Sequence, residues 1–141
     1  MRFMILLKGD EHTEASELPT EAQLTEMGRY NQELVNAGIL RAGDGLQPTS
    51  KGARVRFSGD ARTVENGPFL QTGQLIAGYW IFDVSSRDEA IEWVKRCPKP
   101  LLGDAEIEIR QLYEADDFGD EMTPALREQE EQMRRQSAAR S

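Results

Sequence analysis

The segment that says most about the architecture is Leu75-Ile76-Ala77-Gly78-Tyr79-Trp80-Ile81-Phe82-Asp83-Val84. A strand with one face in water alternates apolar and polar side chains. Here both alternating sets are apolar: one is Leu75, Ala77, Tyr79 and Ile81, and the other is Ile76, Gly78, Trp80, Phe82 and Val84. The segment therefore predicts a strand whose two faces are both covered by other apolar surfaces.

Residues 3–7 show the same two-sided pattern and predict a second strand of this kind. A helix is expected from Thr20, which has capping-box spacing with Gln23, to a stop at Gly38. Its apolar stripe is expected to consist of Leu24, Met27, Leu34 and Val35. The other expected elements are a short strand at 39–42 that residues 43–45 break, a hairpin of strands at 53–57 and 63–65, a helix at 86–97 and a last strand at 105–109.

This order of elements predicts an α+β protein with a ferredoxin-like βαββαβ core and an inserted hairpin. Two helices can cover only one face of such a sheet. The simplest way to cover the other face is a second copy packed sheet to sheet, so we expect a homodimer. The alternative is that the C-terminal segment folds back over the open face.

The composition changes after Tyr113, which predicts a domain at 1–113 and a charged, partly helical extension at 114–141. The extension is rich in Glu, Gln and Arg, and Leu126 and Met133 are almost its only large apolar side chains. Thr123 and Pro124 are expected to begin a helix there, because proline is tolerated at the first helical position.

The composition also narrows the possible partners. The chain has 17 basic and 25 acidic residues and a formal charge of −8, which argues against a nucleic-acid partner. Cys97 and His12 are the only residues of their kinds, so we expect no disulfide within the chain, no metal site and no cofactor. No apolar run approaches the roughly 20 residues that span a bilayer, and we expect a cytoplasmic protein with no membrane partner.

Several motifs together resemble the YCII-related family, and in particular the branch named for an Asp-Gly-Pro-Phe (DGPF) motif. They are Glu65-Asn66-Gly67-Pro68-Phe69, Leu75-Ile76-Ala77-Gly78-Tyr79-Trp80, Asp88-Glu89-Ala90-Ile91-Glu92-Trp93-Val94-Lys95-Arg96-Cys97-Pro98, the segments 43–48 and 51–55, and the tail 117–124. The resemblance covers nearly the whole chain. It implies a dimeric α+β barrel built on a ferredoxin-like domain.

The chain departs from the family pattern at two places. The Asp of the motif is Asn66 here, and the usual Thr-Lys-Glu that follows is Thr72-Gly73-Gln74. Another branch of the family carries a histidine on its first helix, at a position that falls near Met27. The absence of histidine from this helix means that the resemblance assigns no catalytic residue.

Four residues are candidates for contact with a ligand: His12, Asp44, Asn66 and Phe69. His12 lies among acidic residues that would raise its pKa and fix its tautomer in a catalytic role. The alternative is that it belongs to a solvated loop. Asp44 either lines a cleft or turns the chain. Residues 66–69 form either a binding loop or a corner, and turn chemistry explains each residue of the corner.

Three other side chains have plainer interpretations. Arg54 and Arg56 share a strand face that is more simply solvated than anion-binding, and Cys97 is a small core residue. Two functions remain open. The chain either binds a small molecule in a cleft at the barrel edge, near Asp44 and Asn66, or serves as an interaction or regulatory module through its acidic surface and tail.

Overall fold

A computed structural model describes residues 1–70, 72–100 and 103–140. The chain divides into two compact units, Met1–Gln111 and Leu112–Ser141. The first unit contains the sheet, the helices that cover it and the hairpin.

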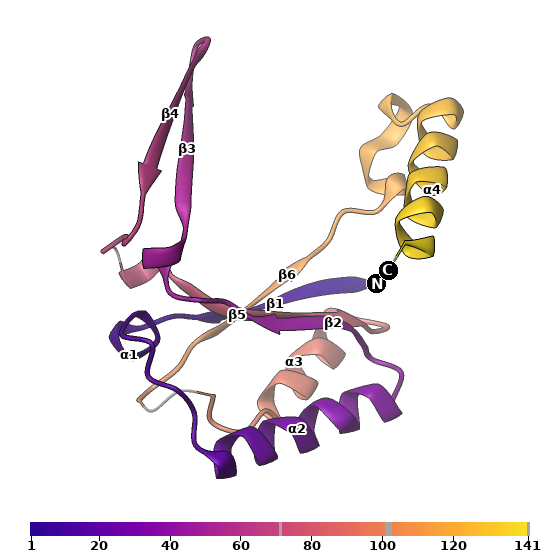
Figure 1. Cartoon of the computed structure of the whole chain (residues 1–141). Coiled ribbons are helices and arrows are strands. Elements are labelled where there is room, and N and C mark those ends of the chain that lie inside the picture. The colour runs from indigo at the N-terminus through magenta and orange to yellow at the C-terminus, as the bar shows by residue number, and fades with distance from the viewer. Residues whose placement is uncertain (71, 101–102, 141) are drawn as a thin grey trace. The chain divides into compact units, whose positions relative to one another are not determined.

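The centre of the first unit is a four-stranded antiparallel sheet with the order β2-β5-β1-β6 (Figure 1). Its strands are β1 (Arg2–Lys8), β2 (Leu40–Gly45), β5 (Ile76–Asp83) and β6 (Ile107–Gln111). The fold is thus α+β with an antiparallel sheet. Among the described residues the sheet is open, with β2 and β6 at its edges, and no closed barrel forms.

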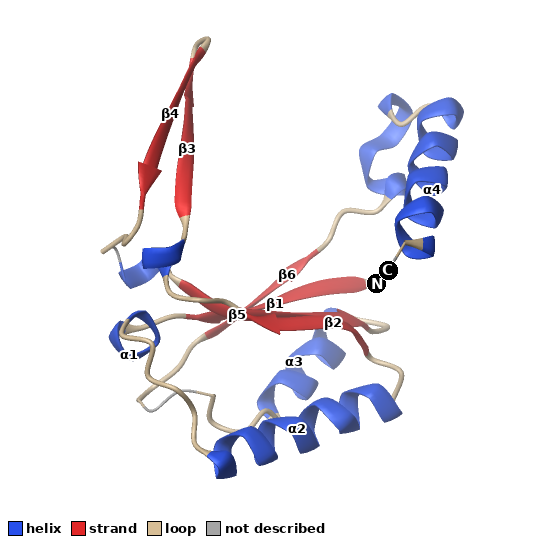
Figure 2. Cartoon of the chain, in the orientation of Figure 1, coloured by secondary structure: helices blue, strands red, loops and turns tan. Residues whose placement is uncertain are grey.

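Helices α2 (Glu21–Asn36) and α3 (Arg87–Lys95) cover one face of this sheet (Figure 2). The predicted helix starts are confirmed, because the Thr20 side chain accepts a hydrogen bond from the Gln23 amide and Ser86 accepts one from the Glu89 amide. The Thr20 amide in turn donates to Gln23 Oε1 at 2.8 Å, which completes the capping box. Satisfying these backbone groups fixes where each helix begins.

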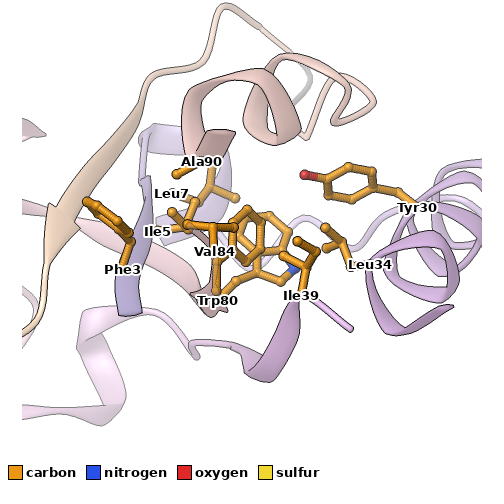
Figure 3. Packing of buried hydrophobic residues seen from close by; sticks show 10 residues of the cluster. Phe3, Ile5, Leu7, Tyr30, Leu34, Ile39, Trp80, Val84 and Ala90 are labelled. Atoms are coloured by element: carbon orange, nitrogen blue, oxygen red, sulfur yellow. The ribbon is translucent and has the colours of Figure 1, made fainter. Parts of the chain in front are cut away.

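The face under the helices contains the core (Figure 3). Phe3 and Ile5 of β1 and Trp80 and Phe82 of β5 are buried there. The other side chains of these strands, such as Tyr79 and Ile81, are only half-buried on the opposite face. The two apolar sets of the β5 segment therefore separate as alternation requires, and the Trp80 set is the one that packs on the helices.

The expected stripe on α2 is partly wrong. Leu34 is fully buried and Met27 packs against the core, but Leu24 and Val35 are 59% and 53% exposed. Tyr30 takes the central place instead, with its hydroxyl donating to the Trp93 carbonyl at 2.7 Å. A tyrosine can be buried in this way because its polar end finds a partner.

Two local expectations were also wrong. Residues 43–45 do not break a strand, because β2 continues through Gly45 and pairs with β5. The polar segment after β1 is not only a loop, because it contains the short helix α1 (Glu11–Glu14). Asp10 and Thr13 form a capping box at its start, so a polar sequence supplies its own backbone partners.

Strands β3 (Ala53–Ser58) and β4 (Ala61–Asn66) form a separate two-stranded sheet. In Figure 1 this hairpin extends away from the central sheet. Every residue of both strands except Arg54 is exposed. Short 3-10 helices precede and follow the hairpin, at Thr49–Lys51 and Thr72–Gln74.

The second unit contains a 3-10 segment, Ala115–Glu121, and helix α4 (Pro124–Ala139). Thr123 caps α4 and Pro124 occupies its first turn, as predicted. Glu130 and Arg134, one helical turn apart on α4, form an ion pair at 2.8 Å. Across the described residues of both units, none of the helices combines the length and apolar character needed to cross a membrane.

Candidate functional site

A pocket of about 450 Å³ lies in the first unit, where α1, α2, the β2 edge of the sheet and residues 98–100 meet. Its apolar lining consists of Leu7, Leu18, Leu24, Met27, Leu40, Ala77 and Trp80. Its polar lining includes His12, Glu17, Asn31, Asp44, Tyr79 and Lys99. An apolar wall with a few convergent polar groups is the usual composition of a small-molecule site.

His12 reaches this pocket from α1, and its Nδ1 is paired with the Glu17 carboxylate. His12 and Glu17 are five residues apart, so the pairing lies within one short segment of the chain. Ser16 adopts a left-handed conformation with φ of 60°, and the Glu17 amide donates back to the His12 carbonyl at 3.2 Å. The Glu17 hydrogen bond and charge raise the pKa of His12, which favours the protonated ring.

Asp44 and Tyr79 also line the pocket and form a second polar pair at the β2 edge of the sheet, on the face opposite to Trp80. They are direct cross-strand neighbours on β2 and β5, and the Tyr79 hydroxyl donates to Asp44 Oδ2 at 3.0 Å. This hydrogen bond and the charge of the Asp44 carboxylate raise the pKa of Tyr79, which favours the protonated phenol as donor. The structure thus brings together two of the four candidate residues, His12 and Asp44, from segments 32 positions apart.

Trp80 is held in the pocket wall by two contacts. Its Nε1 donates to Asn31 Oδ1 at 2.9 Å, and its ring meets Tyr30 edge-on with centroids 6.3 Å apart. Gly43 leaves room for the indole, because a Cβ at that position would lie 3.0 Å from Trp80 Cδ1. The wall is therefore fixed before any ligand arrives, which reduces the ordering cost of binding.

The other two candidates, Asn66 and Phe69, do not line this pocket. Asn66 is exposed at the end of β4 and pairs with Ala53, and its side chain has no hydrogen bond to a described residue. Phe69 is 8% exposed and lies under the Arg54 guanidinium, 3.8 Å from ring centroid to Cζ.

The reason for the Asn-Gly-Pro-Phe sequence is a close approach of two backbones. A Cβ on Gly67 would lie 1.7 Å from the Thr49 carbonyl oxygen, so no larger residue fits. The Phe69 amide donates to Thr49 Oγ1 at 2.9 Å, and Thr49 in turn donates to the Glu14 carboxylate. This chain of contacts ties the base of the hairpin to α1, next to the helix position that carries His12.

Cys97 is half-buried, and burial raises the pKa of its thiol to about 11. A thiol in this state is a poor nucleophile, in line with its predicted role in the core. No group of three or more His, Cys, Asp and Glu side chains that could hold a metal ion occurs in the described part of the chain. The His12–Glu17 pair can supply hydrogen bonds and a proton to the pocket, and the Asp44–Tyr79 pair can supply hydrogen bonds at its edge.

Sequence reasoning missed most of the pocket wall, namely Glu17, Asn31, Tyr79, Trp80 and Lys99. Asn31 and Trp80 are far apart in the sequence, and only the packing of α2 on β5 brings them together. The pairing of Glu17 with His12 had one indication in the sequence, namely that the two residues are five positions apart with a turn between them. Met27, near which the resemblance placed the histidine of another branch, lines the same pocket.

Comparison with known proteins assigns the family. The YCII-related domain matches residues 1–115, which is most of the chain. The chain belongs to the YCII-related domain family. The resemblance noted from the sequence motifs is confirmed at this level.

One curated protein and one solved structure are similar to this YCII-related protein. An uncharacterised protein of Rhizobium meliloti (strain 1021) is 27% identical over 117 residues, which cover 80% of this chain and 94% of that protein. A solved structure of 5-chloro-2-hydroxyhydroquinone dehydrochlorinase from Burkholderia phenoliruptrix AC1100, in complex with 2,5-dihydroxybenzoquinone, is 15% identical with a TM-score of 0.43. That alignment covers 81% of this chain and 96% of the other.

Proposed function

We propose that this YCII-related protein binds a small organic molecule in the pocket between α1, α2 and the β2 edge. The observation that carries the proposal is the pocket lining, in which the apolar residues Leu24, Met27 and Trp80 are combined with the His12–Glu17 pair and bounded at the sheet edge by the Asp44–Tyr79 pair. Such a site accepts an apolar body and orients it through a few hydrogen bonds. The pocket supports this function over a regulatory module that acts through the acidic surface.

His12 is the proton donor of this proposed site. Its pairing with Glu17 favours the imidazolium, whose Nε2 has no hydrogen bond to a described residue. The Tyr79 hydroxyl is engaged by Asp44, which leaves Asp44 with acceptor capacity toward a ligand. A ligand with a hydrogen-bond acceptor near His12 and a donor near Asp44 fits this arrangement.

We further propose the finer features that the sequence suggested. The Asn66-Gly67-Pro68-Phe69 motif supports a place in the DGPF-type branch, and the strand order supports a ferredoxin-like core. The open face of the sheet supports a dimeric α+β barrel. Met4, Leu6, Tyr79 and Ile81 lie side by side there as cross-strand pairs, and an apolar face of this kind marks an interface.

Thermal unfolding in the presence of a metabolite panel tests the binding proposal. A ligand that binds only the folded protein raises its melting temperature. Leu24→Trp should fill the pocket and abolish the shift caused by any hit. Val35→Trp is the matched control, since Val35 is equally exposed on α2 and does not line the pocket.

The expected result is a stabilising compound whose effect is lost in Leu24→Trp and kept in Val35→Trp. An equal effect in both variants would place the ligand elsewhere and contradict the proposal. A His12→Ala variant then tests the proton donor, because its loss should weaken binding of acceptor-bearing compounds by about tenfold, corresponding to one charge-assisted hydrogen bond.

A further inference from the structure

The β3–β4 hairpin has one apolar and one polar face. Strand neighbours alternate between faces, and the register pairs Val55 with Val64, Phe57 with Arg62, and Ala53 with Asn66. These pairs form one face, and Val55, Phe57 and Val64 on it are 51%, 69% and 61% exposed. The other face contains Arg56, Thr63 and Glu65, which is the solvated side that such alternation predicts.

An isolated two-stranded ribbon is marginal in water, yet this one is firmly held at its base. The Gly67 amide donates to the Gly52 carbonyl at 3.0 Å, and Phe69 donates to Thr49. The Arg54 guanidinium covers the Phe69 ring. The hairpin is therefore an arm anchored at its base, and beyond the base it presents exposed apolar side chains.

The arm stands on the side of the sheet that the helices leave open. Figure 2 shows α2 and α3 below the central sheet and the hairpin above it. Any molecule that packs on the open face, with its half-buried Met4, Leu6 and Ile81, therefore has the arm beside it.

We propose that the apolar face of the β3–β4 hairpin packs against a second copy of this chain and clamps the dimer. The inference rests on the dimer of the proposed function and adds a contact surface to it. Charge supports a second copy as the occupant. The arm has three arginines and two carboxylates, with Arg62 on the apolar face, whereas the whole chain has a formal charge of −8. A slightly basic arm thus meets an acidic partner.

Analytical ultracentrifugation of Val64→Lys, with Thr63→Lys as the matched control on the opposite face, tests the clamp. A lysine forced into an apolar contact should raise the dimer Kd by at least about tenfold, whereas the Thr63 variant should match the wild type. Replacing Phe57 by photoreactive p-benzoylphenylalanine should give a covalent dimer on irradiation. The same group at position 63 should not.

The possible outcomes separate the two proposals. A wild type that is monomeric at micromolar concentration would overturn both the dimer and the clamp. A dimer that Val64→Lys leaves unchanged, and that position 57 does not crosslink, would overturn the clamp alone. Crosslinking of position 57 to residues 112–141 within one chain would also overturn the clamp, because the arm would then be covered by its own tail.

Discussion

At the scale of single residues, the corner before the long strand depends on the absence of a side chain. Gly67 approaches the Thr49 carbonyl so closely that any Cβ would overlap it, and Thr49 is itself the link between Phe69 and Glu14. Asn66 adds no side-chain hydrogen bond to a described residue. The structural role of the motif therefore does not depend on whether residue 66 is Asp or Asn. Gly67 permits the close contact with the Thr49 backbone, and Phe69 is the buried side chain.

Gly67→Ala should destabilise the first unit by about 3 kcal/mol, because the corner must open to admit the methyl group. Gly73→Ala is the control, since a Cβ at Gly73 meets nothing within 4 Å. Urea unfolding followed by circular dichroism measures both. Equal midpoints for the two variants would show that the Thr49 carbonyl moves away without cost.

The paired imidazole gives a second prediction at this scale. Glu17→Gln should lower the pKa of His12 toward 6.5, because the carboxylate is the main cause of the raised value. With a folded pKa above the unfolded one, the pairing stabilises the fold fully below about pH 6.5 and its contribution is lost as pH rises through the folded pKa. NMR titration of the imidazole protons measures the shift. A pKa that Glu17→Gln leaves unchanged would contradict the pairing.

At the scale of elements, the parts that could be predicted carry their own local signals. Thr20 and Ser86 begin helices because their side chains satisfy backbone amides three residues on, and β5 was evident from its apolar run. Helix α1 was missed because it has no apolar stripe. The continuation of β2 through Gly43 was missed because glycine favours turns, whereas here it makes room for Trp80. The pocket could not be predicted from the sequence, because its walls come from segments that are far apart in the sequence and meet only in the folded protein.

The second unit provides a prediction about elements. A chain ending at residue 115 should fold with an unfolding midpoint close to that of the full chain. The reason is that the sheet, its helices and the hairpin all lie within Met1–Gln111, and the YCII-related domain ends at residue 115. Thermal unfolding of the two chains makes the comparison. An insoluble or unfolded truncated chain would show that residues 116–141 cover essential apolar surface.

At the scale of the whole molecule, the same strand supplies both the core and the proposed dimer interface. Trp80 and Phe82 are 8% and 0% exposed under the helices, whereas Tyr79 and Ile81 on the other face are only half-buried. The sequence predicted that both faces need a cover. It could not tell which set packs on the helices, because the two sets are almost equally apolar.

Because Trp80 and Ile81 lie on opposite faces of the sheet, a charge introduced at each of these neighbouring positions should have a different effect. Trp80→Glu should unfold the first unit, because it removes the Asn31 hydrogen bond and buries an unpaired charge against Tyr30. Ile81→Glu should leave the fold intact and convert the dimer to a monomer, because twofold symmetry places two such charges at the interface. Light scattering gives the mass and circular dichroism gives the fold. A folded Ile81→Glu protein with the mass of the wild-type dimer would mean that the copies meet elsewhere. An Ile81→Glu protein that unfolds would instead mean that the chain itself covers the second face, since only a charge buried within the subunit would disrupt its fold.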